Sequence, residues 1–311
     1  MTRKIYFLIC VLLTGSLLNS GEAYAKAGVS AQSAIVIEQS TGRVLYSKNS
    51  DAHLPMASTT KIMTAICAIE NGNLEDEVPI SAQAAVTEGS SMYLQEGEKM
   101  KLKELLYGLM LSSGNDAAVA IAEYFGGNDK FVELMNKKTK EVGALDTNFA
   151  NPNGLPDDSH YSTAHDMARI TAYGLKNPEF AQIVSSKTYK VQGEGKAYPR
   201  QLTNHNKLLN MCKGCIGVKT GFTKAAGRCL VSACERDGMT LICVTLNAPN
   251  DWSDHCNLYD DLFSQYKMKK IIESGQRIKE IKMENSETGK ILAVADKDIY
   301  YPLTDGEKTD A

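Results

Sequence analysis

A serine and a lysine with the spacing needed for nucleophilic catalysis occur in the segment Ser58-Thr59-Thr60-Lys61. On an α-helix, positions i and i+3 lie on one face, so the Ser58 hydroxyl and the Lys61 amine can come within hydrogen-bonding distance. A serine hydroxyl becomes a good nucleophile when an adjacent base takes its proton, and a neutral lysine can be that base. The segment therefore predicts a nucleophile, Ser58, beside its base, Lys61.

Lys61 can act as a base only if its ammonium loses a proton near neutral pH. Burial and the positive end of a helix both lower a lysine pKa, whereas a nearby carboxylate raises it. The apolar run over residues 62–69 predicts a buried helix that begins near Ala57 or Ser58 and ends at Asn71-Gly72. Taken alone, the short pattern is more simply explained by a capping serine and a solvated lysine.

Two further polar triplets follow in the chain. Ser113-Gly114-Asn115 lies between two apolar helical segments, where its side chains can project into a cleft, and Lys219-Thr220-Gly221 ends an expected strand. A capping serine or a turn glycine explains either triplet by itself. The three motifs in this order favour a catalytic interpretation of Ser58.

The elements that would position these residues are strands from both ends of the chain and helices from its middle. Strands are expected over residues 33–38, 44–47, 216–220, 228–234 and 239–246, and helices over residues 102–111, 116–125, 129–142, 163–175 and 251–268. This order predicts an α+β fold, in which a mixed or antiparallel sheet is flanked by helices and a helical subdomain stands beside it. The site would lie in the seam, and further short strands are expected beyond residue 276.

Length and composition indicate a globular, exported protein. The chain has 311 residues, enough for one large domain or two ordinary ones. Its net charge of −3 at pH 7 lacks the excess of basic residues that is typical of nucleic-acid-binding proteins. Arg3 and Lys4, the apolar residues 5–18 and Ala23-Tyr24-Ala25 predict a signal peptide over residues 1–25. An uncleaved membrane anchor is the alternative, but the apolar stretch is short and interrupted by polar residues.

The cysteines and histidines do not predict a metal centre. Of 8 cysteines, Cys10 falls in the signal peptide, and the odd number that remains is no disulfide framework, so mostly free thiols are expected. Cys212-x-x-Cys215 lacks the second pair of a structural zinc site, so these are expected to be loop thiols or a local disulfide. The 5 histidines are scattered without metal-ligand spacing, and no metal or cofactor is expected.

In their order, S-x-x-K, S-x-N and K-T-G resemble the motif set of the penicillin-binding proteins and serine β-lactamases. The longer strings over residues 55–64, 112–118 and 219–223 look like those of the low-molecular-mass D-alanyl-D-alanine carboxypeptidases, and the resemblance covers about residues 30 to 270. The loop over residues 151–155 is similar to that family's loop beside the site. The resemblance implies the family's antiparallel sheet flanked by helices, with a catalytic domain over residues 26–268.

The resemblance also implies the chemistry of the serine and lysine motifs. Ser58 would attack the carbonyl of the penultimate D-alanine of a peptidoglycan stem peptide while Lys61 takes its proton, and the terminal D-alanine would leave from an acyl-enzyme. Ser113 and Lys219 would relay a proton to the leaving amine. Because a β-lactam mimics the D-alanyl-D-alanine end, β-lactam antibiotics are expected to acylate Ser58.

The remaining motif residues would bind the substrate. Asn115 would hold a backbone amide of the substrate, while Lys219 and Thr220 receive its terminal carboxylate. Gly221, without a side chain, would let the peptide lie close against the strand edge. The backbone N–H groups of Ser58 and Phe222 would form the oxyanion hole.

Several alternatives stay open at this stage. A class A β-lactamase shares the motif order, but the second motif here is S-G-N, and residues 146–158 contain no glutamate to activate a deacylating water. Glu133 and Glu141 fall in an expected helix. A D-alanyl endopeptidase is barely separable from a carboxypeptidase, and a non-catalytic wall-binding module would not need these motifs intact. Residues 269–311 would be a partial or truncated β-rich domain, whose polar end is unsuited to membrane attachment.

Overall fold

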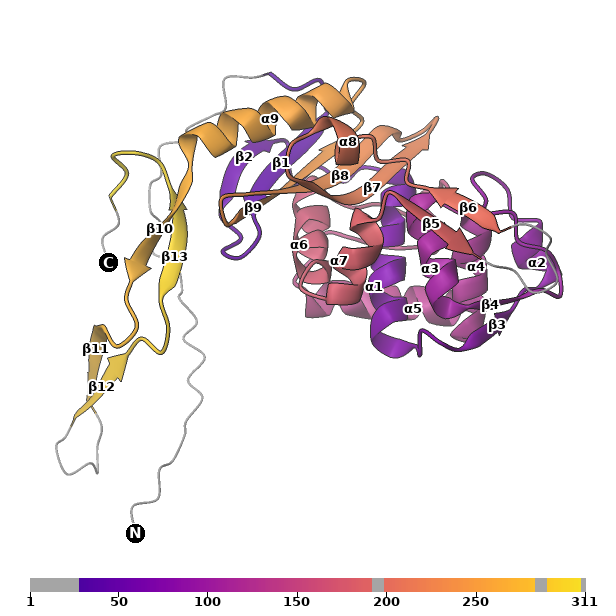
Figure 1. Cartoon of the computed structure of the whole chain (residues 1–311), viewed down its shortest axis with the longest axis horizontal. Helices are drawn as coiled ribbons and strands as arrows, with labels where there is room; N and C mark the ends of the chain where they lie inside the picture. Colours follow the sequence, from indigo (N-terminus) through magenta and orange to yellow (C-terminus); the bar gives the residue numbers. More distant parts are fainter. Residues whose placement is uncertain (1–27, 192–198, 283–289, 309–311) are drawn as a thin grey trace, which may run out of the picture.

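A five-stranded antiparallel sheet forms the centre of the fold (Figure 1), with strand order β2-β1-β9-β8-β7. The computed structural model describes residues 28–191, 199–282 and 290–308, so the expected signal peptide lies outside the described residues. The sheet strands are β1 (Ser33–Glu38), β2 (Val44–Lys48), β7 (Cys215–Thr223), β8 (Gly227–Arg236) and β9 (Met239–Leu246). All five were expected from the sequence, and each neighbouring pair is antiparallel.

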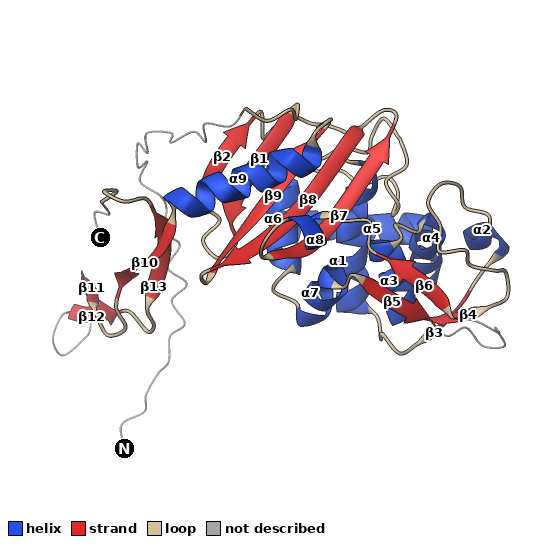
Figure 2. Ribbon diagram, turned by 45° about the horizontal axis from the view of Figure 1, so that its top comes forward, coloured by secondary structure: helices blue, strands red, loops and turns tan. Residues whose placement is uncertain are grey.

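The two faces of the sheet carry separate apolar cores because alternate side chains of a strand point to opposite faces. On one face, Ile35, Val231 and Val244 pack in a core with the helices of the middle of the chain. On the other face, Val36 and Leu230 pack under α9 (Asp251–Gln265). Figure 2 shows α9 lying across its face of the sheet with the short helix α8 (Leu208–Met211) on the same side, while the helical region covers the opposite face.

The helical region begins with a single turn of 3₁₀-helix, η1 (Ala57–Thr60), which continues directly into α1 (Lys61–Asn71). Residues 61–68 of α1 are all buried, as the apolar run predicts. The helices packed around α1 are α3 (Leu102–Leu111), α4 (Asn115–Tyr124), α5 (Asn128–Glu141), α6 (Ala164–Gly174) and α7 (Pro178–Ser185). The expected α+β architecture with a helical subdomain is confirmed.

Several short elements were not expected from the sequence. They are α8, the paired strands β3 (Glu77–Pro79) and β4 (Lys99–Lys101), and β6 (Arg200–Thr203). The sequence does indicate a short helix near residues 82–87 and a strand over residues 189–192. The structure has α2 (Ala82–Ala85) and β5 (Thr188–Val191) there, and β5 pairs with β6. Helix α7 was also missed, although Asn177 caps its start and Pro178 occupies its first turn. Two-strand ribbons of three or four residues are too short to give a periodic signal.

The helix predicted to reach residue 268 ends earlier. Helix α9 stops at Gln265, and β10 (Lys267–Ile272) pairs with β13 (Ile299–Leu303), so the apolar pattern was followed too far. A second hairpin joins β11 (Arg277–Lys282) to β12 (Lys290–Val294), which gives the expected β-rich tail. Across the described residues, no helix combines the length and apolar character needed to cross a bilayer.

Candidate active site

Ser58 lies in the 3₁₀ turn that precedes α1, and local hydrogen bonds fix this turn. The Thr59 hydroxyl donates to the Met56 carbonyl at 2.6 Å, and the Thr60 hydroxyl donates to the Ala57 carbonyl at 2.8 Å. Ala57 has a φ of 48°, a left-handed conformation that costs free energy in a non-glycine residue and is typical of functional sites. The turn brings the Ser58 Oγ to 3.0 Å from the Lys61 Nζ.

The surroundings of Lys61 favour a neutral amine. Its side chain is fully buried, and its Nζ donates to the Asn115 Oδ1 at 2.7 Å and to the backbone carbonyl of Asn153. These two oxygens can only accept hydrogen bonds, so they use both N–H groups of a neutral amine. The lone pair of Lys61 is then left for the third neighbour, and the Ser58 hydroxyl can donate its proton to it.

Electrostatics act in the same direction. Burial, followed by the positive charge of Lys219, lowers the pKa of Lys61 well below its usual value, while Asp116 raises it by a smaller effect. Burial lowers the pKa of Lys219 to about 7.

Ser113 and Lys219 meet across the seam between the helical region and the sheet. The Lys219 Nζ, on β7, lies 3.0 Å from the Ser113 Oγ and also donates to its neighbouring Thr220 carbonyl at 2.8 Å. Ser113 occupies the junction of α3 and α4 with a φ of 60°. Both side chains are at least 95% buried, so this contact is shielded from water.

Asn115 opens α4 and is held at both ends of its amide. Its Nδ2 donates to the Glu88 carbonyl at 2.7 Å, which fixes the Oδ1 toward Lys61. The next residue, Asp116, is fully buried and accepts hydrogen bonds from the Ser91 hydroxyl and from the backbone N–H groups of Met92 and Leu94. The carboxylate therefore ties the loop over residues 88–94 to the start of α4.

Two glycines allow backbone segments to pack against the Ser58 turn. A Cβ on Gly154 would lie 2.0 Å from the Ala57 carbonyl oxygen, and one on Gly221 would lie 3.0 Å from the Ser58 backbone nitrogen. Gly221 thus lets β7 approach the turn, a reason for glycine that the sequence did not suggest. Thr220 and Phe222 flank Gly221 on β7, the edge strand of the sheet, and the Phe222 side chain is exposed.

Sequence reasoning missed two contributors to the site. The first is the Asn153 carbonyl, which reaches Lys61 because the Asn151 Oδ1 accepts from the Gly154 N–H at 2.7 Å and shapes the turn. The second is His160, a buried side chain whose Nδ1 accepts from the Ala150 N–H at 2.9 Å. Its other ring nitrogen lies 2.7 Å from the Thr60 hydroxyl.

The tautomer of His160 follows from these partners. Because Nδ1 accepts from a backbone N–H, the ring proton is on Nε2, which donates to the Thr60 Oγ1. Burial lowers the pKa of His160 to about 4, so the ring is neutral at physiological pH. The Asn-Pro-Asn-Gly turn was a signal for the loop, but no pattern pointed to His160.

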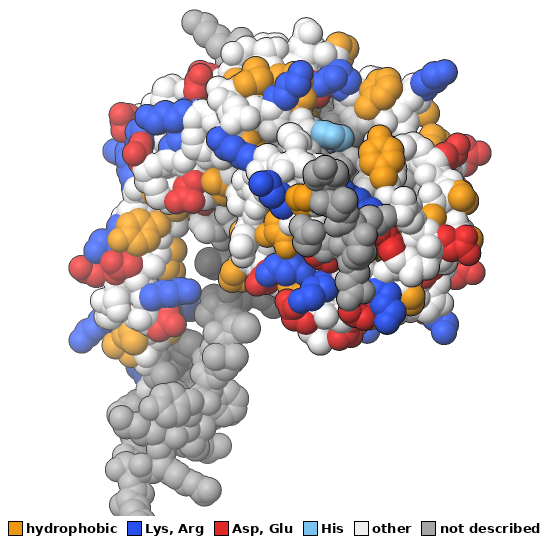
Figure 3. Space-filling view, turned by 45° about the vertical axis from the view of Figure 1, so that its right-hand side comes forward, with side chains coloured by type: hydrophobic (Ala, Val, Ile, Leu, Met, Phe, Trp, Pro, Cys, Tyr) orange, Lys and Arg blue, Asp and Glu red, His pale blue; other side chains and the backbone are white. Residues whose placement is uncertain are grey.

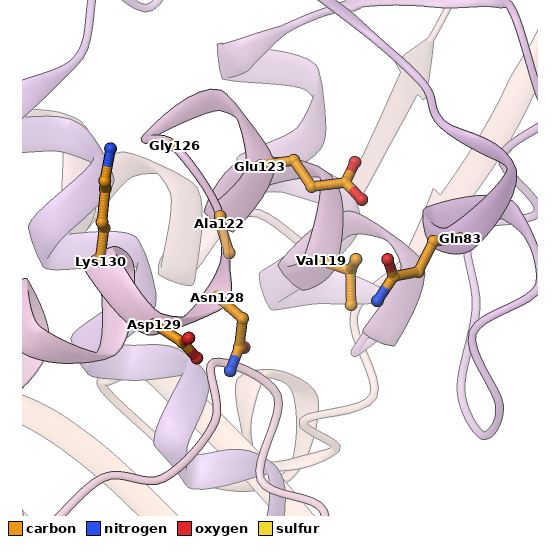
Figure 4. Close-up of a pocket in the computed structure, with 9 residues that line it drawn as sticks. Gln83, Val119, Ala122, Glu123, Gly126, Asn128, Asp129 and Lys130 are labelled. Carbon is orange, nitrogen blue, oxygen red and sulfur yellow. The ribbon is translucent and has the colours of Figure 1, made fainter.

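Other chemically interesting residues lie apart from these groups. Asp157, Asp158 and Lys207 are exposed, and the cysteines of the described region are free thiols. Among the described residues, no group of three or more histidine, cysteine, aspartate or glutamate side chains is arranged to hold a metal ion. A hollow of about 390 Å³ between α2, α4 and α5 is lined by Gln83, Glu123 and neighbouring residues (Figure 4), and none of the motif residues lines it.

The surface in Figure 3 carries charges of both signs. Blue and red side chains are interspersed over this face, and hydrophobic side chains occur singly or in small groups between them. A single-sign stripe, which would attract a polyanion, is not seen on this face.

Comparisons with known proteins agree with this geometry. A family model described as D-alanyl-D-alanine carboxypeptidase matches residues 20–250. The D-alanyl-D-alanine carboxypeptidase DacF of Bacillus subtilis is 36% identical over 85% of this chain and 70% of that protein. A D-alanyl-D-alanine endopeptidase of Pseudomonas aeruginosa is 33% identical over 74% of this chain and 78% of that protein. The crystal structure of the Streptomyces K15 DD-transpeptidase matches with a TM-score of 0.73 and 33% identity, over 77% of this chain and 99% of that one.

Proposed function

This chain belongs to the D-alanyl-D-alanine carboxypeptidase family, and on that premise we propose that Ser58 removes the terminal D-alanine of peptidoglycan stem peptides through an acyl-enzyme. The protein is a serine-type D-Ala-D-Ala carboxypeptidase, a hydrolase of the penicillin-binding protein class. The observation that carries the mechanism is the Lys61 amine, enclosed by two carbonyl-type acceptors with Ser58 as its third neighbour.

In the first step, Lys61 takes the Ser58 proton as Oγ attacks the carbonyl carbon of the penultimate D-alanine. The C–N bond to the terminal D-alanine then breaks, and the leaving amine needs a proton. The Ser113 hydroxyl, 3.0 Å from the Lys219 Nζ, relays that proton with Lys219 to the leaving amine. Water hydrolyses the Ser58 ester and completes the cycle.

Substrate binding is assigned to the edge of β7 and to Asn115. Lys219 and Thr220 receive the terminal carboxylate, because a cation and a hydroxyl suit a small anion in a buried setting. Asn115, already held by Lys61 and Glu88, presents its amide to the substrate backbone. The backbone N–H groups of Ser58 and Phe222 stabilise the tetrahedral oxyanion, and the missing side chain of Gly221 lets their two segments approach.

The cellular setting follows from the family, which acts outside the cytoplasm. We assign residues 1–25 to an export signal, residues 26–268 to the catalytic domain and residues 269–311 to a β-rich segment. The change from α9 to β10 at residues 265–267 supports the second boundary. Peptidoglycan stem peptides ending in D-Ala-D-Ala are the substrates, and β-lactam antibiotics are expected to acylate Ser58.

Intact-protein mass spectrometry after incubation with benzylpenicillin tests the acyl-enzyme. We expect a stable adduct on the wild type and none on Ser58→Ala. The same preparations are then given a peptide ending in D-Ala-D-Ala, from which the wild type should release free D-alanine. A folded wild type without an adduct would overturn the proposal.

The peptide assay also separates the related activities. Rapid penicillin turnover without D-alanine release would indicate a β-lactamase, although Glu133 and Glu141 both lie in α5 and residues 146–158 hold no glutamate. Cleavage of crosslinked peptides in preference to D-alanine release would indicate an endopeptidase.

A further inference from the structure

Four free cysteines gather away from the active site, where the C-x-x-C turn meets β8 and α9. The Cys212 Sγ lies 3.6 Å from the Cys234 Sγ, so these thiols are in contact. Cys215 is the cross-strand partner of Cys234 in the β7–β8 pair, and Cys256 on α9 is near enough to Cys212 to contribute to the lowering of its pKa. The sequence left open whether Cys212 and Cys215 are loop thiols or a local disulfide, but the sulfur that Cys212 contacts belongs to Cys234 on β8.

Backbone contacts hold this approach in place. The Cys215 N–H donates to the Cys212 carbonyl at 3.1 Å, which closes the turn, and the Glu235 N–H donates to the Gly214 carbonyl at 2.9 Å. Gly214 has a φ of +79°, and a Cβ there would lie 2.3 Å from the Glu235 carbonyl oxygen. The turn is therefore pressed against β8, and the proximity of the two sulfurs does not depend on flexible side chains alone.

Arg236 distinguishes Cys212 from its neighbour. Its guanidinium donates to the Cys212 Sγ at 3.6 Å and is itself anchored by Asp260 at 2.8 Å and by the Lys213 carbonyl at 3.0 Å. A hydrogen bond from Cys234, with Cys256 and Arg236 contributing, lowers the pKa of Cys212 to about 6, whereas the pKa of Cys234 is raised. Cys212 is thus the thiolate of the pair, and Cys234 remains a thiol.

A metal site is the main alternative use of clustered thiols. The described residues contain no set of three or more such ligands arranged to hold a metal ion. A thiolate beside an arginine and a second thiol is instead the arrangement in which oxidation of one sulfur is followed by disulfide formation. Because Cys212 is only 8% exposed, the oxidant must be small.

We propose that Cys212 and Cys234 are a dithiol that a hydroperoxide oxidises to a disulfide. The Cys212 thiolate attacks the distal peroxide oxygen and breaks the O–O bond, which gives a sulfenic acid and releases the alkoxide or hydroxide, protonated to an alcohol or water. The Cys234 sulfur then attacks the Cys212 sulfur, loses its proton and expels the sulfenic hydroxyl as water. The two sulfurs are oxidised by two electrons in total, and the peroxide is reduced by two.

The disulfide would close a loop over residues 213–233, which includes most of the β7–β8 hairpin and therefore Lys219. Crosslinking this loop restricts the unfolded chain, so the oxidised protein should be the more stable form. For a loop of this length in a protein of this size, we expect a rise in Tm of about 5 °C.

Trypsin makes the test specific because Lys213 separates Cys212 from Cys215. Cleavage yields the peptides 208–213, 214–219 and 229–236, which carry Cys212, Cys215 and Cys234 respectively. After treatment of the folded protein with one equivalent of hydrogen peroxide, we expect a mass loss of about 2 Da and a crosslink between peptides 208–213 and 229–236. Fragmentation of the linked pair should place the bond at Cys234, since peptide 229–236 also contains Cys229.

Two variants separate this pair from its neighbours. Cys215→Ser should keep the crosslink and the rise in Tm, whereas Cys212→Ser should lose both while unfolding cooperatively in the reduced state. A crosslink from peptide 214–219, either to 208–213 or to 229–236, would overturn the assignment. So would oxidation that stops at sulfinic acid without a disulfide, or no oxidation at all.

Discussion

Replacing Lys219 by methionine should stabilise the fold at neutral pH while abolishing acylation. The side chain of Lys219 is 99% buried, and burial lowers its pKa from the usual 10.5 to about 7. The unfolded chain therefore binds more protons than the folded one between these two values, and the free energy of unfolding of the wild type rises with pH across that window. At pH 7 and below, protonation of the buried Lys219 lowers the free energy of unfolding by about 5 kcal/mol relative to a lysine with the usual pKa.

Methionine has a similar length and needs no proton, but it loses two hydrogen bonds. Those bonds join Lys219 to the Ser113 hydroxyl and to the Thr220 carbonyl, and each contributes about 1 kcal/mol. We therefore expect Lys219→Met to be about 3 kcal/mol more stable than the wild type at pH 7. The difference in stability between Lys219→Met and the wild type should vanish near pH 9, because the remaining protonation cost of about 2 kcal/mol then equals the two lost hydrogen bonds. At higher pH the wild type should be the more stable protein.

Urea unfolding at several pH values between 6 and 10 measures this difference. Lys207→Met is the matched control, because Lys207 is exposed and its replacement removes a lysine without changing the buried seam. If the difference between Lys219→Met and the wild type is constant from pH 7 to 10, the reasoning about the buried ammonium is refuted. A variant that is less stable at pH 7 would refute it equally.

Three further perturbations test other parts of the site. Burial lowers the pKa of His160 to about 4, so the unfolded chain binds a proton at this residue before the folded chain does. The His160 ring should therefore cost the wild type about 3 kcal/mol of unfolding free energy as the pH falls from 6.5 to 4. His160→Gln should abolish this loss, which urea unfolding across the same pH range measures. Gly154→Ala should destabilise the fold by about 3 kcal/mol or more, because the new Cβ would lie 2.0 Å from the Ala57 carbonyl oxygen. Gly97→Ala is the control, since Gly97 has a similar φ of +80° but open space around it, and it should cost about 1 kcal/mol. Equal losses of unfolding free energy in urea would contradict the packing argument. Phe222→Ala keeps the backbone N–H, so its rate of acylation by benzylpenicillin should stay within a few-fold of the wild type. Phe222→Pro removes this N–H and should slow acylation by about 10² or more. A large loss in the alanine variant would show that the Phe222 side chain, and not its backbone N–H, is needed for acylation.

The parts of the site that follow from local geometry could be predicted from the sequence. Ser58 and Lys61 belong to one helical turn, so their spacing alone predicts an approach that the structure gives as 3.0 Å. The strand that carries Lys219 was also predictable, because its β-branched pattern is local. The contact between Ser113 and Lys219 depends on tertiary structure, which local sequence patterns do not give. The order of the three motifs indicated this contact only through the family resemblance.

The parts that could not be predicted depend on contacts between distant segments. The Asn153 carbonyl and the His160 ring meet the Ser58 turn from about 90 to 100 residues away in the sequence, and neither a backbone carbonyl nor a lone histidine has a distinctive pattern. Gly221 was expected to make room for the substrate, yet its missing Cβ makes room for the Ser58 backbone. Helix α9 was extended too far because the pairing of β10 with β13 outweighed the helical pattern.

Whether Lys61 can be the base depends on Asp116, since a nearby carboxylate raises a lysine pKa. Asp116 is fully buried, but its oxygens accept from the Ser91 hydroxyl and from the N–H groups of Met92 and Leu94 rather than from Lys61. Its charge is thus stabilised by the loop it organises, and its effect on Lys61 ranks below those of burial and of Lys219. The burial that keeps Lys61 deprotonated also lowers the stability of the folded state, because both Lys61 and Lys219 must be removed from water. The environment that makes Ser58 reactive therefore reduces the stability of the fold.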